Sequence, residues 1–277
     1  MTQSHFRPIS VQPAGVSLGL DSPELAVAYD RDGTRQFEHG KLLLASLELR
    51  PGERVLDIGC GTGRLGAYAA ELVGPDGAVA GLDPLPLRVE LAARKNARFA
   101  AYVGRAEDLS VFPSERFDAA FANSVFHWVE HKPRALAEAR RVLKPGGRFA
   151  VNSADAERPH QSVALVREAL VELGLDAAAS SLGTNFRVSG AELSRLLVEA
   201  GFVDVRVQPH TFVDTLAGAA DLVEWSRSSS FGNFLAQLGD SQLERVRARL
   251  DEKLEARRTA AGLTLERYLV FATARKP

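Results

Sequence analysis

The sequence predicts an α/β fold, a doubly wound parallel sheet with helices on both faces. Short apolar runs rich in β-branched residues alternate along the chain with helical patterns of leucine and alanine. This alternation is typical of crossover connections between parallel strands. A turn with glycine at every second position, Gly59 to Gly63, joins the first apolar run to the helical pattern after it. Two later runs end at Asp83 and near Asn123. Ligands of open α/β sheets bind at the carboxyl ends of the strands, so we expect the functional site there.

Length and composition set the broad class of protein. The 277 residues suit one full-sized domain with an elaborated cap, and 45% hydrophobic with 25% charged residues is ordinary for a soluble globular chain. A net charge of −1 and a pI near 6.6 give little attraction for nucleic acid. The amino terminus has no apolar signal core, and nowhere do ~18 apolar residues run together. We therefore expect a cytoplasmic protein without a membrane span; the oligomeric state is left open.

The expected elements follow one another in the order of such a sheet. Proline and glycine at residues 1–23 predict an extended arm, and leucines at residues 24–49 predict helices. Ser189-x-x-Glu192 is a capping box that opens another helix. Strands are expected at residues 53–58, 78–83, 100–103, 117–122, 148–152, 203–207 and 267–274. Further helices are expected at residues 65–70, 87–97, 133–142, 162–173, 217–227, 231–238 and 241–258.

The glycine turn has the geometry of a cofactor site. Glycine permits positive φ and a close approach of backbone to ligand, and the following helix start leaves free N–H groups. Gly61-x-Gly63-x-x-Gly66 also fits the dinucleotide fingerprint. Asp57 stands before the first glycine, where a carboxylate would repel a diphosphate and attract a cationic amino group. The pattern thus favours a cofactor that carries an ammonium and no phosphate.

Residues 55–63, Val-Leu-Asp-Ile-Gly-Cys-Gly-Thr-Gly, resemble the first motif of the class I S-adenosylmethionine (SAM) dependent methyltransferases. Leu-Lys-Pro-Gly-Gly at residues 143–147 is a second signature of that family. The resemblance is strong over residues 50–152 and looser over 188–210 and 265–275. It implies a seven-stranded Rossmann-like sheet whose last strand is antiparallel, a helical cap, SAM as cofactor and S-adenosylhomocysteine (SAH) as product.

The resemblance also implies a division of the chain into segments with different tasks. In order, these are an N-terminal arm with lid helices (1–49), the SAM-binding core (50–152), an insertion (153–187), a continuation of the core (188–210), a helical cap (211–263) and the final core strand (264–277).

The cofactor-binding residues that the resemblance implies follow the strand ends. They are Tyr29, Asp57, Gly59, Cys60, Gly61, Gly63, Asp83, Pro84, Ala106, Glu107 and Asn123. Asp57 is expected near the methionine ammonium, directly or through water. Asp83, next to Pro84, is expected to accept from the ribose hydroxyls. Ala106 and Glu107 flank the adenine in a loop that carries Arg105 where the family often has aspartate. Asn123 lies by the methionine or the methyl group, and Tyr29 belongs to the lid or packs beneath it.

Several subclasses are excluded by missing residues. The segment after Asn123 lacks the two prolines of nucleobase amino-methyltransferases. The single cysteine, Cys60, lies inside the cofactor loop, so no cysteine nucleophile for pyrimidine C5 methylation, no thiol set for arsenite and no disulfide is available. We identify no carboxylate cluster for a metal, and no metal is expected. What remains is methylation of a small molecule at oxygen, nitrogen or carbon.

Candidates for the acceptor site follow the fourth strand and lie in the cap. His127, just beyond that strand, either acts as catalytic base, orients the acceptor or packs over the cofactor. Trp128 is expected to pack at the floor of the acceptor pocket. In the cap, Trp225, Phe231 and Asn233 either grip the acceptor or belong to a helix-to-helix turn with serine caps.

Other functions stay open at this stage. Arg187 and His210 suit an acidic acceptor, whereas a quinone or sterol acceptor predicts an apolar cap pocket. A protein that binds SAM without catalysis and, more remotely, a nicotinamide oxidoreductase are the alternatives from other classes.

Overall fold

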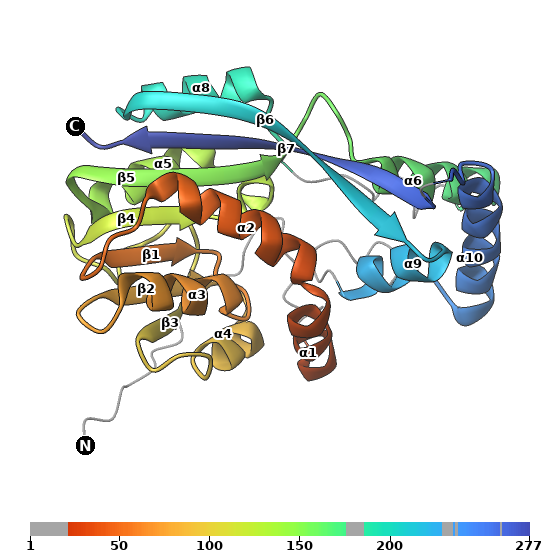
Figure 1. The fold of residues 1–277 in the computed structure, drawn as a ribbon, viewed down its shortest axis with the longest axis horizontal. Coiled ribbons are helices and arrows are strands. Elements are labelled where there is room, and N and C mark those ends of the chain that lie inside the picture. The colour runs from red at the N-terminus through yellow and green to blue at the C-terminus, as the bar shows by residue number, and fades with distance from the viewer. Residues whose placement is uncertain (1–21, 176–185, 229–234, 236–237, 261) are drawn as a thin grey trace.

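The computed structural model of the protein describes residues 22–175, 186–228, 235, 238–260 and 262–277 (Figure 1). Its described part contains a seven-stranded sheet in the order β3-β2-β1-β4-β5-β7-β6. The strands are β1 (Arg54–Ile58), β2 (Ala78–Asp83), β3 (Phe99–Val103), β4 (Phe117–Ala122), β5 (Leu143–Ala154), β6 (Val203–Leu216) and β7 (Leu263–Arg275). β1 to β5 pair in parallel, and β7 runs antiparallel between β5 and β6. The doubly wound sheet with an antiparallel last strand is thus confirmed.

Helices cover both faces of this sheet. They are α1 (Pro23–Asp32), α2 (Thr34–Leu47), α3 (Arg64–Val73), α4 (Pro86–Ala92), α5 (Lys132–Val142), α6 (Gln161–Glu172), α8 (Gly190–Glu199), α9 (Ala219–Ser228) and α10 (Asp240–Glu255), with a 3-10 turn η2 (Phe126–Trp128). α2, α3 and α4 pack on one face through leucine, valine and alanine side chains, and α5 and α8 pack on the other. Figure 1 shows α2 and α3 in front of the sheet and α5 behind it. Because the central strands are covered on both faces, their sequences are continuous apolar runs.

Several elements differ in length from the sequence-based expectation. β5 begins at Leu143 rather than at residue 148, and β7 begins at Leu263 rather than at residue 267. The helix expected at residues 231–238 lies largely outside the described residues. α4 ends at Ala92 rather than at residue 97. β6 runs on to Leu216, well past the expected end at residue 207 and into the segment expected to be cap. Pro209 makes the sequence look unlike a strand there, but β6 is the edge strand of the sheet. At an edge, the missing N–H of proline breaks no ladder hydrogen bond when it faces outward.

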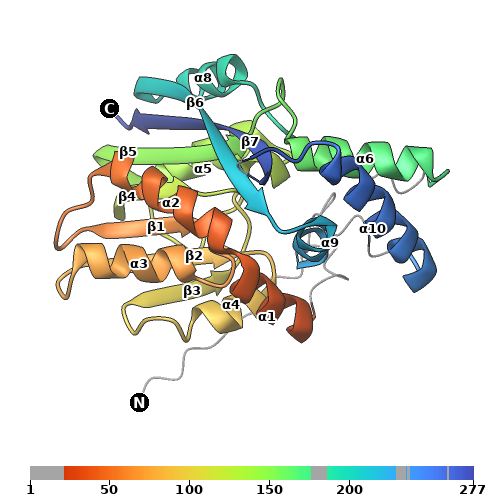
Figure 2. The same cartoon turned by 45° about the vertical axis from the view of Figure 1, so that its right-hand side comes forward.

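The β6–β7 pair extends beyond the sheet as a two-stranded ribbon. β5 pairs with β7 up to Ala154 and Leu269, whereas the β6–β7 pairing continues to Leu216 and Leu263. Figures 1 and 2 show this ribbon reaching from the sheet to α6, α9 and α10. The side chains packed around its far end include Leu165, Val166, Leu170, Leu216, Leu222, Val246, Leu250, Leu254 and Leu263. The ribbon therefore joins the cap helices to the sheet.

The elements next to the cap also frame one side of the sheet. α1 packs against α9, where Arg31 bonds to Glu224 at 3.3 Å, and α1 also contacts α4.

Within the described residues, the helices are all too short or too polar to cross a membrane.

Candidate active site

The turn between β1 and α3 brings backbone close to three neighbouring elements. Gly59 and Cys60 donate their N–H groups to the carbonyl of Leu82 at 2.8 and 2.9 Å, which ties the turn to the end of β2. Gly59 has φ of 75°, and a Cβ on it would lie 2.2 Å from a methyl of Val125. Only glycine fits such a conformation and such a contact. The turn therefore lies directly below the loop that follows β4.

Gly63 serves the packing behind the turn. It has φ of 81° and precedes the first residue of α3. A Cβ on it would lie 2.8 Å from the Cα of Ala92 and 2.7 Å from the ring of Phe99. Gly63 does not line either of the cavities described below. Its place thus favours a structural task within the turn over a contact with the cofactor.

Asp83 fixes the turn from the tip of β2. Its Oδ2 accepts the N–H of Gly61 at 2.9 Å, and its Oδ1 accepts the N–H of Leu85 at 3.0 Å. The side chain is buried, with 5% of the residue's surface exposed. Asp83 and the following Pro84 line the wall of the main cavity.

This main cavity, about 160 Å³ in volume, opens at the carboxyl ends of the central strands. It brings together most of the predicted site residues. Those that line it are Tyr29, Gly59, Gly61, Asp83, Pro84, Ala106, Glu107, Asn123, His127 and Trp128. They come from α1, the glycine turn and the loops after β2, β3 and β4. The parallel strands therefore gather, at one edge, side chains that are up to 99 positions apart in the chain.

A second cavity of about 40 Å³ adjoins the first, with Gly59, Tyr29 and Asn123 in both linings. Its lining includes Asp57 and Cys60. Cys60 is buried, and burial raises the pKa of its thiol well above the ordinary value. Asp57 is buried with 2% of its surface exposed.

Two acceptor oxygens in this smaller cavity have no hydrogen-bond partner among the described residues: Asp57 Oδ2 and Gln36 Oε1. Burial, and then the charge of Asp83, raise the pKa of Asp57 well above its usual range, while a bond from the Gly66 backbone opposes the shift. A buried polar atom without a partner is costly. The site is therefore suited to a ligand that donates hydrogen bonds and carries positive charge.

Tyr29, on α1, lies over the glycine turn. A Cβ on Gly61 would lie 3.3 Å from its ring, and the guanidinium of Arg88 stacks on that ring at 3.8 Å from the centroid. Burial raises the pKa of the Tyr29 hydroxyl. Tyr29 thus packs on the glycine turn and on Arg88, and it forms part of the cavity wall.

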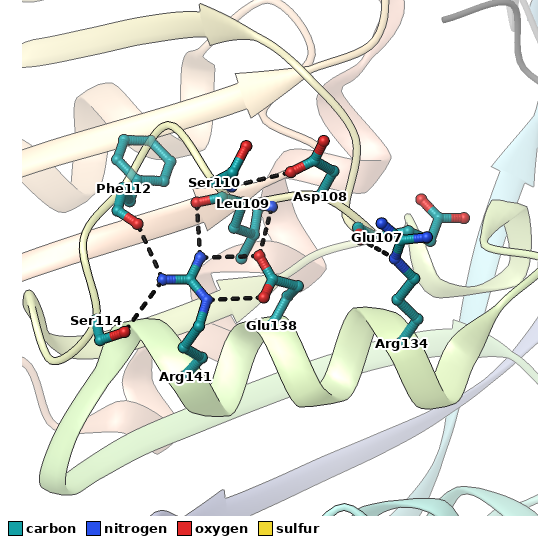
Figure 3. Close-up of polar contacts among 9 residues, drawn as sticks. All are labelled: Glu107, Asp108, Leu109, Ser110, Phe112, Ser114, Arg134, Glu138 and Arg141. Atoms are coloured by element: carbon teal, nitrogen blue, oxygen red, sulfur yellow. Dashed lines mark hydrogen bonds and ion pairs between the residues drawn. The ribbon is translucent and has the colours of Figure 1, made fainter.

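The loop after β3 carries Ala106 and Glu107 and is braced by α5. Arg134 donates to the carbonyl of Glu107 at 2.8 Å, as Figure 3 shows. Arg105 lies 3.5 Å from the Glu107 carboxylate and also lines the cavity. Ala106 and Glu107 thereby face the cavity from a fixed backbone.

One ion pair on α5 holds the rest of this loop. Glu138 accepts the N–H of Leu109 at 2.8 Å and pairs with Arg141 at 2.7 Å. Arg141 also donates to the carbonyls of Leu109 and Phe112, at 2.9 and 3.0 Å (Figure 3). The bond from Arg141 is the main cause that lowers the pKa of Glu138. A guanidinium offers several donors in one plane, which lets a single side chain fix several points of the loop.

His127 lies in η2, directly after β4. Its Nδ1 accepts the N–H of Ala154 at 3.4 Å, so in the neutral ring the proton sits on Nε2. Burial, together with the charges of His160, Arg187 and Lys132, lowers the pKa of His127 to about 3. A side chain this weakly basic is unsuited to general-base catalysis near neutral pH. The geometry favours a hydrogen-bond donor that orients the acceptor.

Two further histidines line the same cavity: His39, which the sequence suggests as a lid contact beside Tyr29, and His160, which sequence reasoning missed. His160 accepts the N–H of Tyr268 on Nδ1 at 3.1 Å, and burial lowers its pKa to about 3. His39 bonds to Ser124 at 2.7 Å on one ring nitrogen and to Arg267 at 3.2 Å on the other. Three of the chain's six histidines thus meet in one cavity. No local motif joins them, and their rarity in the sequence was the one available signal.

Some of the residues expected at the acceptor site line the main cavity, and others do not. Trp128 lines the cavity beside His127, with ring centroids 5.0 Å apart. Arg187 lines it as well. The ring of His210 packs on Phe271 at 4.3 Å and is not part of the lining. Trp225 belongs to α9 by its backbone; its side chain, as well as Phe231 and Asn233, lies outside the described residues.

The fold and these two cavities define a Rossmann-like cofactor-binding protein, and comparisons with known proteins identify its family. Residues 56–151 match a family model described as a methyltransferase domain. The chain is 30% identical to trans-aconitate 2-methyltransferase of Deinococcus radiodurans over 77% of this chain and 83% of that protein. The chain therefore belongs to the class I SAM-dependent methyltransferases, whose cofactor is SAM. This assignment removes the nicotinamide alternative.

Two further comparisons show similarity in sequence and in fold. The chain is 34% identical to an uncharacterized 37.1 kDa protein in transposon TN4556 of Streptomyces fradiae, over 69% of this chain; it spans 55% of that longer relative. In fold, it resembles phosphoethanolamine N-methyltransferase 2 of Haemonchus contortus, solved with SAM, at a TM-score of 0.59 and 19% identity. That likeness covers 92% of this chain and 57% of the other.

Proposed function

We propose that the protein transfers the methyl group of SAM to a small organic molecule bound beside His127. The observation that supports it most directly is the pair of unpartnered oxygens, Asp57 Oδ2 and Gln36 Oε1, in one buried cavity. An ammonium group brings three N–H donors and a positive charge, which is what these two acceptors lack. The methionine part of SAM carries such a group.

The remaining contacts follow from where the side chains lie. Asp83 faces the main cavity from the tip of β2 and is proposed to accept from the ribose hydroxyls. Ala106 and Glu107, in the loop braced by α5, are proposed to flank the adenine. Asn123 lines both cavities and is proposed to lie between the methionine and the methyl group. The backbone of the glycine turn is proposed to pass beneath the cofactor.

When bound, SAM supplies an electrophilic methyl group on a sulfonium. The protein has to hold the acceptor atom in line with it and keep water out, and positioning alone supplies several kcal/mol, up to ~7–11. Tyr29 and Trp128 wall the cavity, and His127 presents a donor to the acceptor. A tightly held acceptor proton would need a base, and the low basicity of His127 and His160 favours an acceptor that needs none.

The alternatives predict different behaviour. A quinone or sterol acceptor would fit an apolar pocket, whereas arginine and histidine side chains contribute to this cavity wall. A protein that binds SAM without catalysis would show cofactor affinity and no turnover with any acceptor. The cytoplasmic location, the absence of nucleic acid as a partner and the division of the chain into core, insertion and cap stay part of this proposal.

Calorimetric titration with SAM and SAH tests the cofactor site. We expect binding to the native chain and an affinity at least about tenfold lower in Asp57→Asn, equal to ~1.4 kcal/mol. Glu90→Gln, which removes the same charge from an exposed side chain on α4, should bind as the native chain does. Binding of NADH in place of SAM, or equal loss in both variants, would contradict the proposal. SAH release with a panel of small acceptors then separates a catalyst from a binding protein.

A further inference from the structure

The carboxylates that line the main cavity lie on one of its sides. On the side of β2 and β3, the lining includes the carboxylates of Asp83 and Glu107 together with the guanidiniums of Arg88 and Arg105. On the side of β4, β5 and β7, the described lining residues contribute no carboxylate. They contribute the imidazoles of His39, His127 and His160 and the guanidiniums of Arg187 and Arg267. Because no described carboxylate lines the side of β4, β5 and β7, that side suits an anion.

Two of the histidines are held in the same tautomer by neighbouring strands. Ala154, at the end of β5, donates to Nδ1 of His127, and Tyr268, on β7, donates to Nδ1 of His160. Ala154 is the register partner of Leu269, the residue after Tyr268. A backbone N–H can only donate, so each Nδ1 is an acceptor and each neutral ring carries its proton on Nε2. The neighbouring strands β5 and β7 therefore hold two Nε2–H donors in place within one cavity lining.

Among the described charged groups around these rings, cations dominate. After burial, the charges of His160, Arg187 and Lys132 lower the pKa of His127. Arg187 and Arg267 lower the pKa of His160, and the carboxylate of Asp155 raises it. Asp155 is paired with Arg158 at 3.0 Å, and Arg267 is paired with Asp214. Arg187 is half-buried in the cavity wall, where burial lowers the pKa of its guanidinium.

We propose that His127 and His160, together with Arg187, form an oxyanion-binding site, and that the acceptor is an organic acid whose carboxylate is methylated there. This inference rests on the proposed function and names the acceptor class. The carboxylate oxygen forms the new O–CH3 bond, the S–CH3 bond breaks, and its electron pair stays on sulfur. No proton has to be removed, which agrees with two histidines that act as donors. The product is a methyl ester.

The same donors could instead bind the cofactor, since SAM and SAH also carry a carboxylate. The two roles predict different binding behaviour. If His127 and His160 bound that group, their loss would weaken SAH itself. If they bind the acceptor, SAH affinity should stay unchanged while acid binding falls.

The test uses acids matched to neutral analogues of the same shape. Benzoate, cinnamate and fumarate, and the three corresponding amides, are titrated into the native protein saturated with SAH. We expect acids to bind and amides to bind at least about tenfold more weakly. At least one acid should yield an alkali-labile methyl ester when SAM replaces SAH. Equal binding of acids and amides, or binding of none of the acids, would overturn the oxyanion site.

Matched variants assign the effect to the histidine donors. His160→Asn keeps an acceptor near Nδ1 but loses the distal donor, whereas His160→Gln keeps a donor at the distal position. The same pair is made at His127. Loss of a hydrogen bond to a charged group predicts roughly 10- to 100-fold weaker acid binding in the asparagine variants, and a smaller loss in the glutamine variants. SAH affinity and the melting temperature of each variant are measured in parallel.

The outcomes separate this inference from the proposed function. If SAH binds natively but falls in the asparagine variants, the donors serve the cofactor and the acid site is wrong. If neither SAM nor SAH binds the native chain, the proposed function itself fails. If SAH binding is intact and the asparagine and glutamine variants lose acid binding equally, the effect is structural and the oxyanion site is overturned.

Discussion

Asp57 and Asp83 belong to adjacent parallel strands, and the charge of Asp83 adds to burial in raising the pKa of Asp57. The protein thus keeps two buried carboxylates close together, and no described donor bonds to Asp57 Oδ2. Such an arrangement costs stability until a cation enters it. The first two predictions follow from this relationship.

Asp57→Asn should stabilise the ligand-free protein at neutral pH. A carboxyl whose folded pKa is raised contributes stability below its unfolded pKa, near 3.8, and that contribution is lost as pH rises through the folded pKa. The advantage of the variant should therefore grow with pH and vanish in acid. At pH 7 we expect at least about 1 kcal/mol, since each unit of pKa shift is worth ~1.4 kcal/mol. Urea denaturation at several pH values measures it; a destabilised variant at pH 7 would contradict the prediction.

Binding of SAM should release protons. A cation beside Asp57 favours its ionised form, so the bound pKa is lower than the raised pKa of the free protein. Between these two values, affinity should rise with pH. Calorimetry in buffers of different ionisation enthalpy measures the protons released, and Asp57→Asn should abolish the part that arises from this residue. A buffer-independent enthalpy in the native chain between pH 5 and 7 would argue against ammonium binding at Asp57.

Gly63→Ala should destabilise the fold more than Gly52→Ala. Both glycines have φ near 80°, but a Cβ meets Ala92 and Phe99 at Gly63 and nothing within 4 Å at Gly52. In the control, Gly52→Ala, the positive φ alone should lower the free energy of unfolding, by roughly 1–2 kcal/mol. The clash should add about 1–3 kcal/mol, as overpacking does. Thermal and urea denaturation compare the two, and similar losses would mean that the turn can relax away from Phe99.

His127 and His160 should stay neutral, with the proton on Nε2, well below the pH at which free histidine titrates. Burial lowers the pKa of both rings to about 3, from the ordinary value of 6.5. The stability that they contribute is complete above pH 6.5 and declines as pH falls toward 3. Long-range nitrogen–proton NMR spectra identify tautomer and charge directly. An imidazolium signal from either ring at pH 5, or a proton on Nδ1 at pH 7, would refute the assignment.

Arg141→Met should weaken SAM binding although Arg141 does not line the cavity. Its loss frees Leu109 and Phe112 in the loop that carries Glu107, so the loop has to be ordered when the cofactor binds. We expect a several-fold rise in the dissociation constant, about 1 kcal/mol. Arg140→Met, the adjacent residue on α5, removes a bond to the carbonyl of Gly201 instead and should leave SAM affinity unchanged.

Much of the fold and half of the site could be predicted because their signals are local. The glycine turn, Asp57 and Asp83 belong to single strand–turn–helix segments, where spacing reflects geometry directly. The edge position of β6, which tolerates Pro209, depends on the whole sheet and was therefore missed. His160 and Gln36 were missed for a similar reason: neither belongs to a motif, and they join the site only because β5 ends, β7 passes and α2 begins beside it.

The ribbon of β6 and β7 has a consequence for how this protein diversifies. Leu216 and Leu263 are register partners. The chain therefore leaves the ribbon at the end of β6 and re-enters it at the start of β7 directly opposite. A short hairpin turn between these two residues would close the sheet again without moving any strand of the cofactor site. A change in the length of the segment between them would therefore leave the register of β6 and β7 unchanged. It would reach the cavity wall through α9, which packs against the helix that carries Tyr29.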